Sequence, residues 1–111
     1  MISVAHFAAS AGDADDFAER ARAALAALAA RPGYLRGSLG RSTDGDADWV
    51  LITEWENVGS YRRALGNYEV KLLASTLLAD ALDLPSSFEP LLEMAPGGAT
   101  IERGSDRGEA G

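Results

Sequence analysis

Hydrophobic and polar positions along the chain follow two different periods, which predict strands and helices in turn. Residues 2–9 form a short apolar run with small residues between its larger side chains, a pattern typical of a strand. From Asp13 onward, apolar side chains recur at helical spacing until Pro32-Gly33, where we expect the helix to end. This stripe consists of Phe17, Ala21, Ala24, Leu25 and Leu28.

A hairpin is predicted next, with strands over residues 34–42 and 49–55 and a polar loop between them. On the first strand we expect Leu35, Gly37 and Leu39 to share one face. The second strand is apolar on both faces, so each face needs a cover. Helices can cover one face, but 111 residues leave nothing for the other. The sequence therefore predicts that a second copy covers it, forming a homodimer.

A second helical region and a last strand complete the pattern. Asn57 or Ser60 can cap the helix, Gly66-Asn67 interrupts it, and we expect its continuation to run over residues 68–84. Its expected apolar stripes consist of Tyr61, Leu65, Tyr68 and Leu72, followed by Leu72, Leu73, Leu77 and Leu78.

The last strand is expected over residues 87–94, with Pro90 at an edge or bulge. Residues 96–111 hold five glycines and alternating charges, which predicts a disordered tail behind one domain of residues 1–95. The order strand, helix, strand, strand, helix, strand predicts a ferredoxin-like α+β fold, βαββαβ, with an antiparallel sheet.

Composition narrows the possible partners. Seventeen acidic and ten basic residues leave a net charge of -7, which disfavours nucleic acid and anionic membrane surfaces. The chain has no cysteine, so it has no disulfide or thiolate chemistry, as suits a reducing compartment. Its longest apolar run, residues 23–30, is too short to cross a bilayer. We therefore expect a soluble cytoplasmic protein.

Four short motifs then point to a family. They are PGYL at residues 32–35, STD at 42–44, TEWEN at 53–57 and YR at 61–62. In this order and spacing they resemble the antibiotic biosynthesis monooxygenase family of dimeric α+β barrels. The resemblance implies two sheets packed face to face, with a mostly apolar pocket between each sheet and its helices. Some members of the family oxidise aromatic phenols with O2 and no cofactor, and others bind and cleave haem.

The resemblance also implies roles for particular positions. Trp55 and Tyr61 match a tryptophan and a tyrosine of the oxygenases' substrate pocket, whereas an asparagine of that pocket corresponds to Leu51. An arginine of the same pocket falls near Ser75. The axial histidine of the haem-cleaving members falls at about Leu73 and their ring-distorting tryptophan at about Ala64, which disfavours haem degradation.

Three further residues are candidates from their chemistry. Histidine is the side chain that most often exchanges protons near neutral pH, so His6 is the candidate base, although a lone histidine is more often structural. Asn67 and Lys71 could orient an anionic oxygen, or could simply be solvated. Aspartates at 44, 46 and 48 begin like a calcium loop, but position twelve is Trp55, and no metal site is expected.

These observations lead to one hypothesis and one alternative. The hypothesis is a dimeric monooxygenase that acts on an aromatic or quinol-type compound without metal or flavin. In it, His6 and Tyr61 act as base or hydrogen-bond partner, Trp55 forms the pocket wall, and Asn67 and Lys71 contact the substrate. The alternative is a non-catalytic dimer that binds a hydrophobic metabolite.

Overall fold

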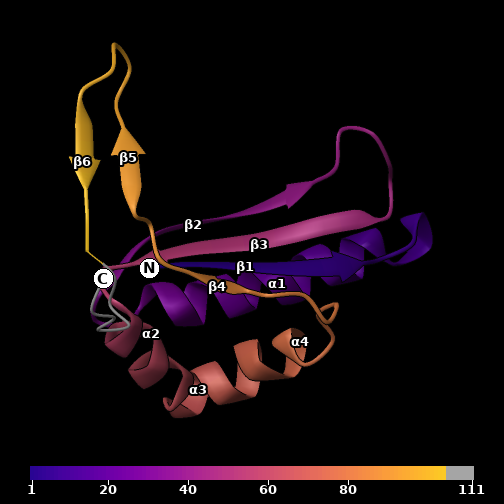
Figure 1. The fold of residues 1–111 in the computed structure, drawn as a ribbon. Coiled ribbons are helices and arrows are strands. Elements are labelled where there is room, and N and C mark those ends of the chain that lie inside the picture. The colour runs from indigo at the N-terminus through magenta and orange to yellow at the C-terminus, as the bar shows by residue number, and fades with distance from the viewer. Residues whose placement is uncertain (105–111) are drawn as a thin grey trace.

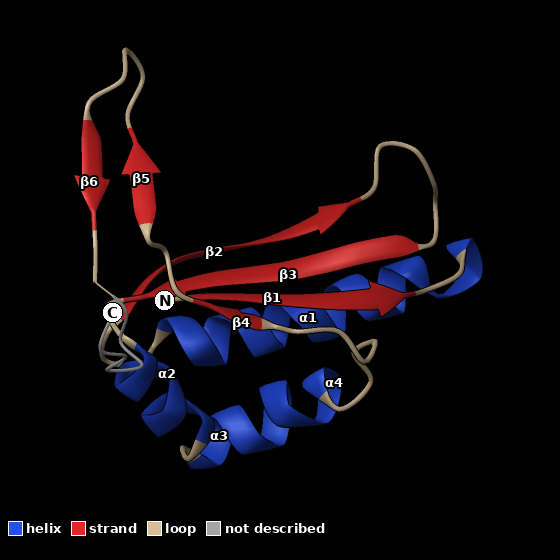
Figure 2. Ribbon diagram, viewed as in Figure 1, coloured by secondary structure: helices blue, strands red, loops and turns tan. Residues whose placement is uncertain are grey.

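The computed structural model describes residues 1–104, which form a four-stranded antiparallel sheet with helices on one face and a separate two-stranded hairpin (Figures 1 and 2). The sheet order is β2-β3-β1-β4. Its strands are β1 (Ile2–Ala8), β2 (Tyr34–Arg41), β3 (Asp48–Trp55) and β4 (Ser87–Phe88). This order and the βαββαβ succession confirm the ferredoxin-like fold.

The helices form the second layer. They are η1 (Ala11–Asp13), α1 (Ala14–Ala29), α2 (Val58–Leu65), α3 (Tyr68–Val70), η2 (Lys71–Ser75) and α4 (Thr76–Leu78). The predicted stripe of α1 is confirmed at Phe17, Ala21, Ala24 and Leu28, which are all buried. Because α1 and the α3–α4 segment lie side by side under the sheet, their contacts close the core.

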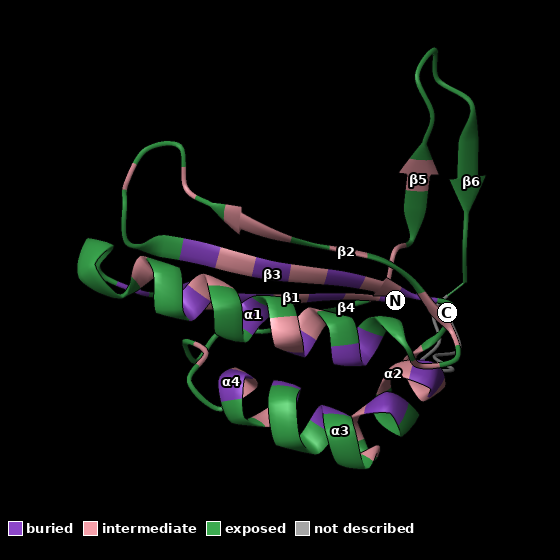
Figure 3. Ribbon diagram, turned by 180° about the vertical axis from the view of Figure 1, so that it is seen from behind, coloured by how far each residue is buried: buried purple, intermediate pink, exposed green. Residues whose placement is uncertain are grey.

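The two central strands have a covered and an open face, and β3 shows the alternation in Figure 3. Buried residues face the helices, whereas the residues between them are half-buried on the opposite side. The helix-facing residues are Ser3, Ala5, Phe7, Trp49, Leu51, Thr53 and Trp55. The residues on the opposite side, here called the open face, include Ile2, Val4, His6, Val50, Ile52 and Glu54.

The prediction of which β2 side chains share a face is wrong at the start of the strand. Tyr34 pairs with Trp55 and Arg36 with Glu54, so Leu35 is an extra residue at a bulge. Because of the bulge, Tyr34 lies on the helix side of the sheet, the same side as Leu39, and Leu35 is exposed.

The second helical region begins and breaks as predicted but does not keep the predicted stripes. The Asn57 side chain accepts a hydrogen bond from the Ser60 amide, and α2 ends at Leu65. Tyr68 and Leu72 are exposed. The break and the π-helical turn η2 change the helical phase, so Leu73 is exposed as well, whereas the predicted Leu77 is buried together with Val70 and Ala74.

The chain after residue 78 also departs from the prediction. Helix α4 ends at Leu78, and the following segment runs along β1, where the Leu82 amide donates to the His6 carbonyl. The expected strand over residues 87–94 is two strands, because Pro90 lies between β4 and β5 (Leu92–Met94).

Part of the expected tail is folded. Strand β5 pairs with β6 (Thr100–Glu102), and this hairpin rises from the open side of the sheet (Figure 1). Residues 96–104 thus form its turn and return strand, whereas the rest of the predicted tail lies outside the described residues. Among residues 1–104, no helix is long and apolar enough to span a membrane.

Candidate functional site

Three aromatic rings meet where β3 joins α2. The Trp55 ring is 1% exposed, and its centroid lies 5.4 Å from Tyr34 in an edge-on contact and 5.5 Å from Tyr61. Its indole Nε1 donates to Thr53 Oγ1 at 2.8 Å. The predicted residues Trp55 and Tyr61 are therefore brought together, but Trp55 is enclosed by the core.

Two hydroxyl groups from opposite layers also meet. Ser3 Oγ on β1 donates to the Tyr61 phenol oxygen on α2 at 3.3 Å. Thr53 lies directly opposite Ser3 in the β1–β3 pairing, and both residues are buried. A short polar track thus crosses the otherwise apolar helix side of the sheet, from Trp55 through Thr53 and Ser3 to Tyr61.

A cavity of about 250 Å³ opens at the end of this polar track. Ser3 contributes the sheet side of its wall and Tyr61 the α2 side, and Asp83 is the carboxylate in its lining. The remaining lining residues are mostly apolar, namely Val4, Ala5, Leu78, Ala81, Leu82, Leu84 and Ser86. Volumes near 300 Å³ mark the small end of ligand pockets, so this cavity suits a small aromatic molecule. It is called the Tyr61 cavity below.

The structure does not bring His6 to Tyr61. His6 lies three residues after Ser3 on the same strand, so its side chain lies on the open face, where it pairs with Val50. There it lines a different cavity, beside Gly40 and Val50. The sheet therefore stands between the predicted base and the predicted phenol.

Asn67 and Lys71 also lie apart from the cavity lining given above. The Asn67 side chain accepts from the Val70 amide at 3.2 Å and caps α3, which is a structural role. Lys71 is exposed at the first position of η2.

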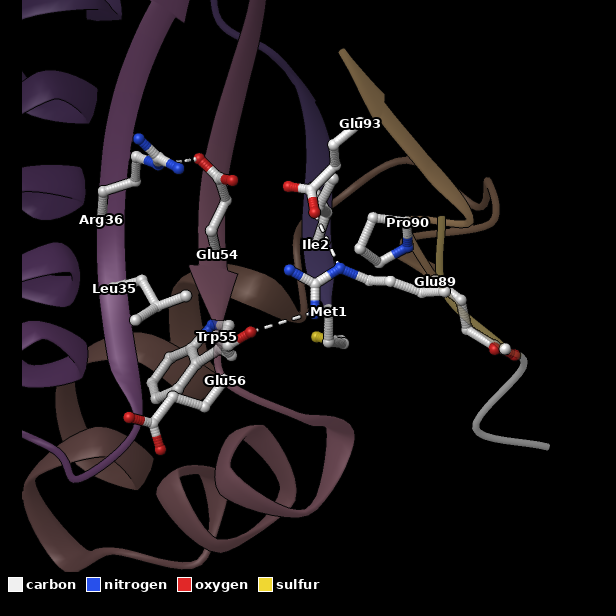
Figure 4. Close-up of a pocket in the computed structure, with 12 residues that line it drawn as sticks. Met1, Ile2, Leu35, Arg36, Glu54, Trp55, Glu56, Glu89, Pro90 and Glu93 are labelled. Atoms are coloured by element: carbon white, nitrogen blue, oxygen red, sulfur yellow. Dashed lines mark hydrogen bonds and ion pairs between the residues drawn. The ribbon is translucent and has the colours of Figure 1, made fainter. Parts of the chain in front are cut away.

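A second cavity of about 250 Å³ lies on the open side, at the base of the β5–β6 hairpin (Figure 4). Its wall is charged: Arg36 pairs with Glu54, and Arg103 pairs with Glu93 at 2.7 Å. The terminal amino group of Met1 donates to the Trp55 carbonyl at 3.0 Å. Aromatic ligands favour pockets that are lined mostly by apolar side chains. Because charged pairs form much of its wall, this cavity is less suited to an aromatic ligand than the Tyr61 cavity.

Two lining residues were missed by the sequence reasoning. Ser3 could have been noticed as a polar residue in phase with the buried Phe7 on the first strand. Asp83 gave no such signal, because it was assigned to a helix that ends five residues earlier.

Comparison with known proteins identifies the family of the chain. The family profile described as antibiotic biosynthesis monooxygenase matches residues 1–73, so the chain belongs to this family. Among curated proteins, none matches the chain significantly.

Solved structures agree with the fold. A variant of SnoaB, a cofactor-independent oxygenase from Streptomyces nogalater, is 28% identical over 73% of this chain and 82% of its own, with a TM-score of 0.63. Another SnoaB structure is 21% identical, covering 97% and 95% of the two chains at a TM-score of 0.62. PA3566 from Pseudomonas aeruginosa is 15% identical, covering 94% and 93% at a TM-score of 0.61.

Proposed function

We propose that this protein is a cofactor-independent oxygenase that oxidises a small aromatic phenol or quinol in the Tyr61 cavity. The observation that carries the proposal is the pairing of a half-buried phenol with a buried serine hydroxyl at the wall of a cavity that leucine and alanine side chains also line. Family membership and the likeness to SnoaB support the same reaction class.

The proposed reaction balances without an external reductant. An anthrone, whose enol tautomer is a phenol, supplies four electrons to O2. Its methylene carbon gains one oxygen atom as a carbonyl, and the second oxygen atom leaves as water with the two methylene hydrogens. Singlet substrates react with triplet O2 only slowly, so the protein must favour the electron-rich substrate anion that gives O2 its first electron.

The residues of the cavity divide this task. The Tyr61 phenol donates a hydrogen bond to the anionic oxygen of the substrate. Asp83, exposed at the cavity wall, takes the proton that the substrate loses and exchanges it with solvent. The apolar side chains of Leu78, Leu82 and Leu84 line the cavity and pack against the ring of the substrate.

The active form proposed here is a homodimer joined through the open face. In the single chain, Val4, Val50 and Ile52 form a half-buried apolar strip across β1 and β3, on the face opposite the helices. The neighbouring hairpin also exposes Leu91, Leu92, Met94 and Ile101, each by more than half. Apolar surface of this kind is rare on a monomer and common at interfaces between subunits.

The reaction is tested by following O2 uptake with anthrone and with substituted hydroquinones. We expect uptake above the rate without protein, a loss of at least about tenfold in kcat for Tyr61→Phe, and a smaller loss for Asp83→Asn. The variant His6→Ala separates the two assignments of the base. Full activity in His6→Ala supports the Tyr61 cavity, whereas a loss equal to that of Tyr61→Phe favours the histidine on the open face.

A second candidate function is binding without turnover. It is favoured by the leucines that narrow the Tyr61 cavity and by the burial of Trp55, whose ring is packed between Tyr34 and Tyr61. Tight binding of an aromatic ligand with no O2 uptake from any of the substrates tested would support this candidate against the oxygenase.

A further inference from the structure

We propose that Ser3 is a positioning residue that holds Tyr61 as a hydrogen-bond donor, so that the Tyr61 cavity selects planar ligands carrying an acceptor oxygen. The inference rests on the ligand site of the proposed function but not on its chemistry.

Within residues 1–104 the buried polar side chains are Ser3, Thr53 and Ser60. Ser60 is held by Asn57 in the α2 cap, with both its amide and its hydroxyl donating to the Asn57 side chain at 2.8 Å. Thr53 accepts the indole hydrogen of Trp55. Ser3 instead donates to a residue that lines a cavity, and it lines that cavity itself. Burial of a hydroxyl is costly without a partner, and here the partner is Tyr61.

The direction of this hydrogen bond determines what the cavity offers a ligand. A phenol has one hydrogen to donate and lone pairs that accept. Ser3 Oγ lies 3.3 Å from the Tyr61 oxygen, within reach of a hydrogen bond. In the proposed arrangement Ser3 donates in this bond, so the Tyr61 hydrogen is left for a ligand. The leucine and alanine side chains of the lining then favour a ring system, and the single phenol hydrogen selects an oxygen that can accept.

Neither Leu51 nor Thr53, the neighbouring residues on the helix side of the sheet, offers a free polar group to Tyr61. Leu51, which shares the helix side of β3 with Thr53, is apolar and buried, so it adds no polar group to the sheet wall. Thr53 lies opposite Ser3 but is engaged by Trp55. The polarity of the sheet wall beside Tyr61 therefore comes from β1, fifty-eight residues away in the chain.

The test compares the binding of 1-tetralone and tetralin, which differ in a carbonyl group and share the fused rings. Binding is measured by calorimetry or by saturation-transfer NMR. We expect the full chain to bind tetralone about three- to tenfold more tightly than tetralin, the value of one hydrogen bond. Tyr61→Phe should abolish this preference. Ser3→Ala should reduce it by at least about twofold.

Matched variants separate positioning from general damage. Ser3→Thr keeps the hydroxyl and should restore the preference, and Ser3→Cys, close in size to serine, should lower it if Ser3→Ala does not fold. Ser38→Ala, on an exposed position of β2, should leave the preference unchanged. If the role of Ser3 were merely structural, Ser3→Ala would weaken the binding of both ligands equally. The ratio of their affinities would then stay as in the unaltered chain.

The outcomes are decisive in each direction. The inference is overturned if Ser3→Ala keeps the full preference, or if the unaltered chain binds neither ligand or binds both equally. Because neither compound has to be turned over, a preserved preference with no O2 uptake from anthrone would reject the oxygenase and leave the role of Ser3 intact.

Discussion

Tyr34 illustrates how one extra residue changes the chemistry of a side chain. The bulge at Leu35 turns the Tyr34 ring under the sheet, where its edge packs on Trp55. Burial there raises the pKa of the Tyr34 phenol above its ordinary value of about 10. The folded chain therefore keeps this proton at alkaline pH values where the unfolded chain has already lost it.

This shift predicts a loss of stability at high pH. The contribution of Tyr34 is constant below about pH 10 and is lost as the pH rises toward the higher pKa of the folded state. We expect the urea midpoint to fall between about pH 9 and about pH 11, and to fall less in Tyr34→Phe, which keeps the ring. Tyr68→Phe is the control, because Tyr68 is exposed. An equal fall in Tyr34→Phe and the unaltered chain would contradict the prediction.

At the scale of elements, the junction of α1 with β2 is tied to the start of α2. Gly33 has a φ of +88°, and its carbonyl accepts from the Glu56 amide at 2.8 Å. A Cβ atom on Gly33 would lie 2.3 Å from Ser60 Oγ and 2.4 Å from Ser60 Cβ. Both the left-handed backbone and the close approach therefore require glycine at this position.

Gly33→Ala is expected to destabilise the fold by about 2 to 4 kcal/mol, from backbone strain and from overpacking against the buried Ser60. The measurement is the free energy of unfolding in urea. Gly12→Ala is the matched control, because a Cβ there meets no atom within 4 Å, and its effect should stay within about 0.5 kcal/mol. Equal effects of the two substitutions would show that the contact with Ser60 yields without cost.

At the scale of the whole molecule, the helices cover one side of the sheet, and the hairpin rises from the other side (Figures 1 and 3). The open face is apolar along its centre, from Ile2 and Val4 on β1 to Ile52 on β3. A second copy placed on this face would bury it, which is the physical basis of the proposed dimer.

The dimer predicts a mass of about twice the 11.6 kDa of one chain in light scattering after size exclusion. Ile52→Asp places a charge in the middle of the open face and should halve this mass without unfolding the chain. Ala26→Asp adds the same charge on the exposed side of α1 and should leave the mass unchanged. A monomeric unaltered chain at micromolar concentration would rule out an interface of this kind.

Much of the fold was predictable because neighbouring residues decide it. The apolar spacing from Phe17 to Leu28 predicted α1, and Asn57 and Gly66 predicted where α2 begins and ends. By contrast, the phase of the helix after Gly66 depends on the turn η2, and the last strand was divided at Pro90. The helical phase follows from packing against distant residues, which periodicity does not contain, whereas the division of the strand follows from the missing amide hydrogen of Pro90.

The candidate site was predictable only in part. Trp55 and Tyr61 were named from their motif, and the structure places them in contact. His6 lies on the same face of β1 as Ile2 and Val4, and which face of β1 the helices cover depends on long-range packing. That packing puts His6 on the side away from Tyr61 and puts Ser3, which was not named, beside it.

The sequence by itself determined the order of the elements and the family, because local periodicity and short motifs are properties of adjacent residues. Only the tertiary structure decided which hydroxyl meets Tyr61, because Ser3 and Tyr61 are brought together by strand pairing and by a helix packed across the sheet. The tertiary structure also decided the bulge at Leu35 and the hairpin of residues 92–102, since pairing between strands, and not local preference, sets their positions.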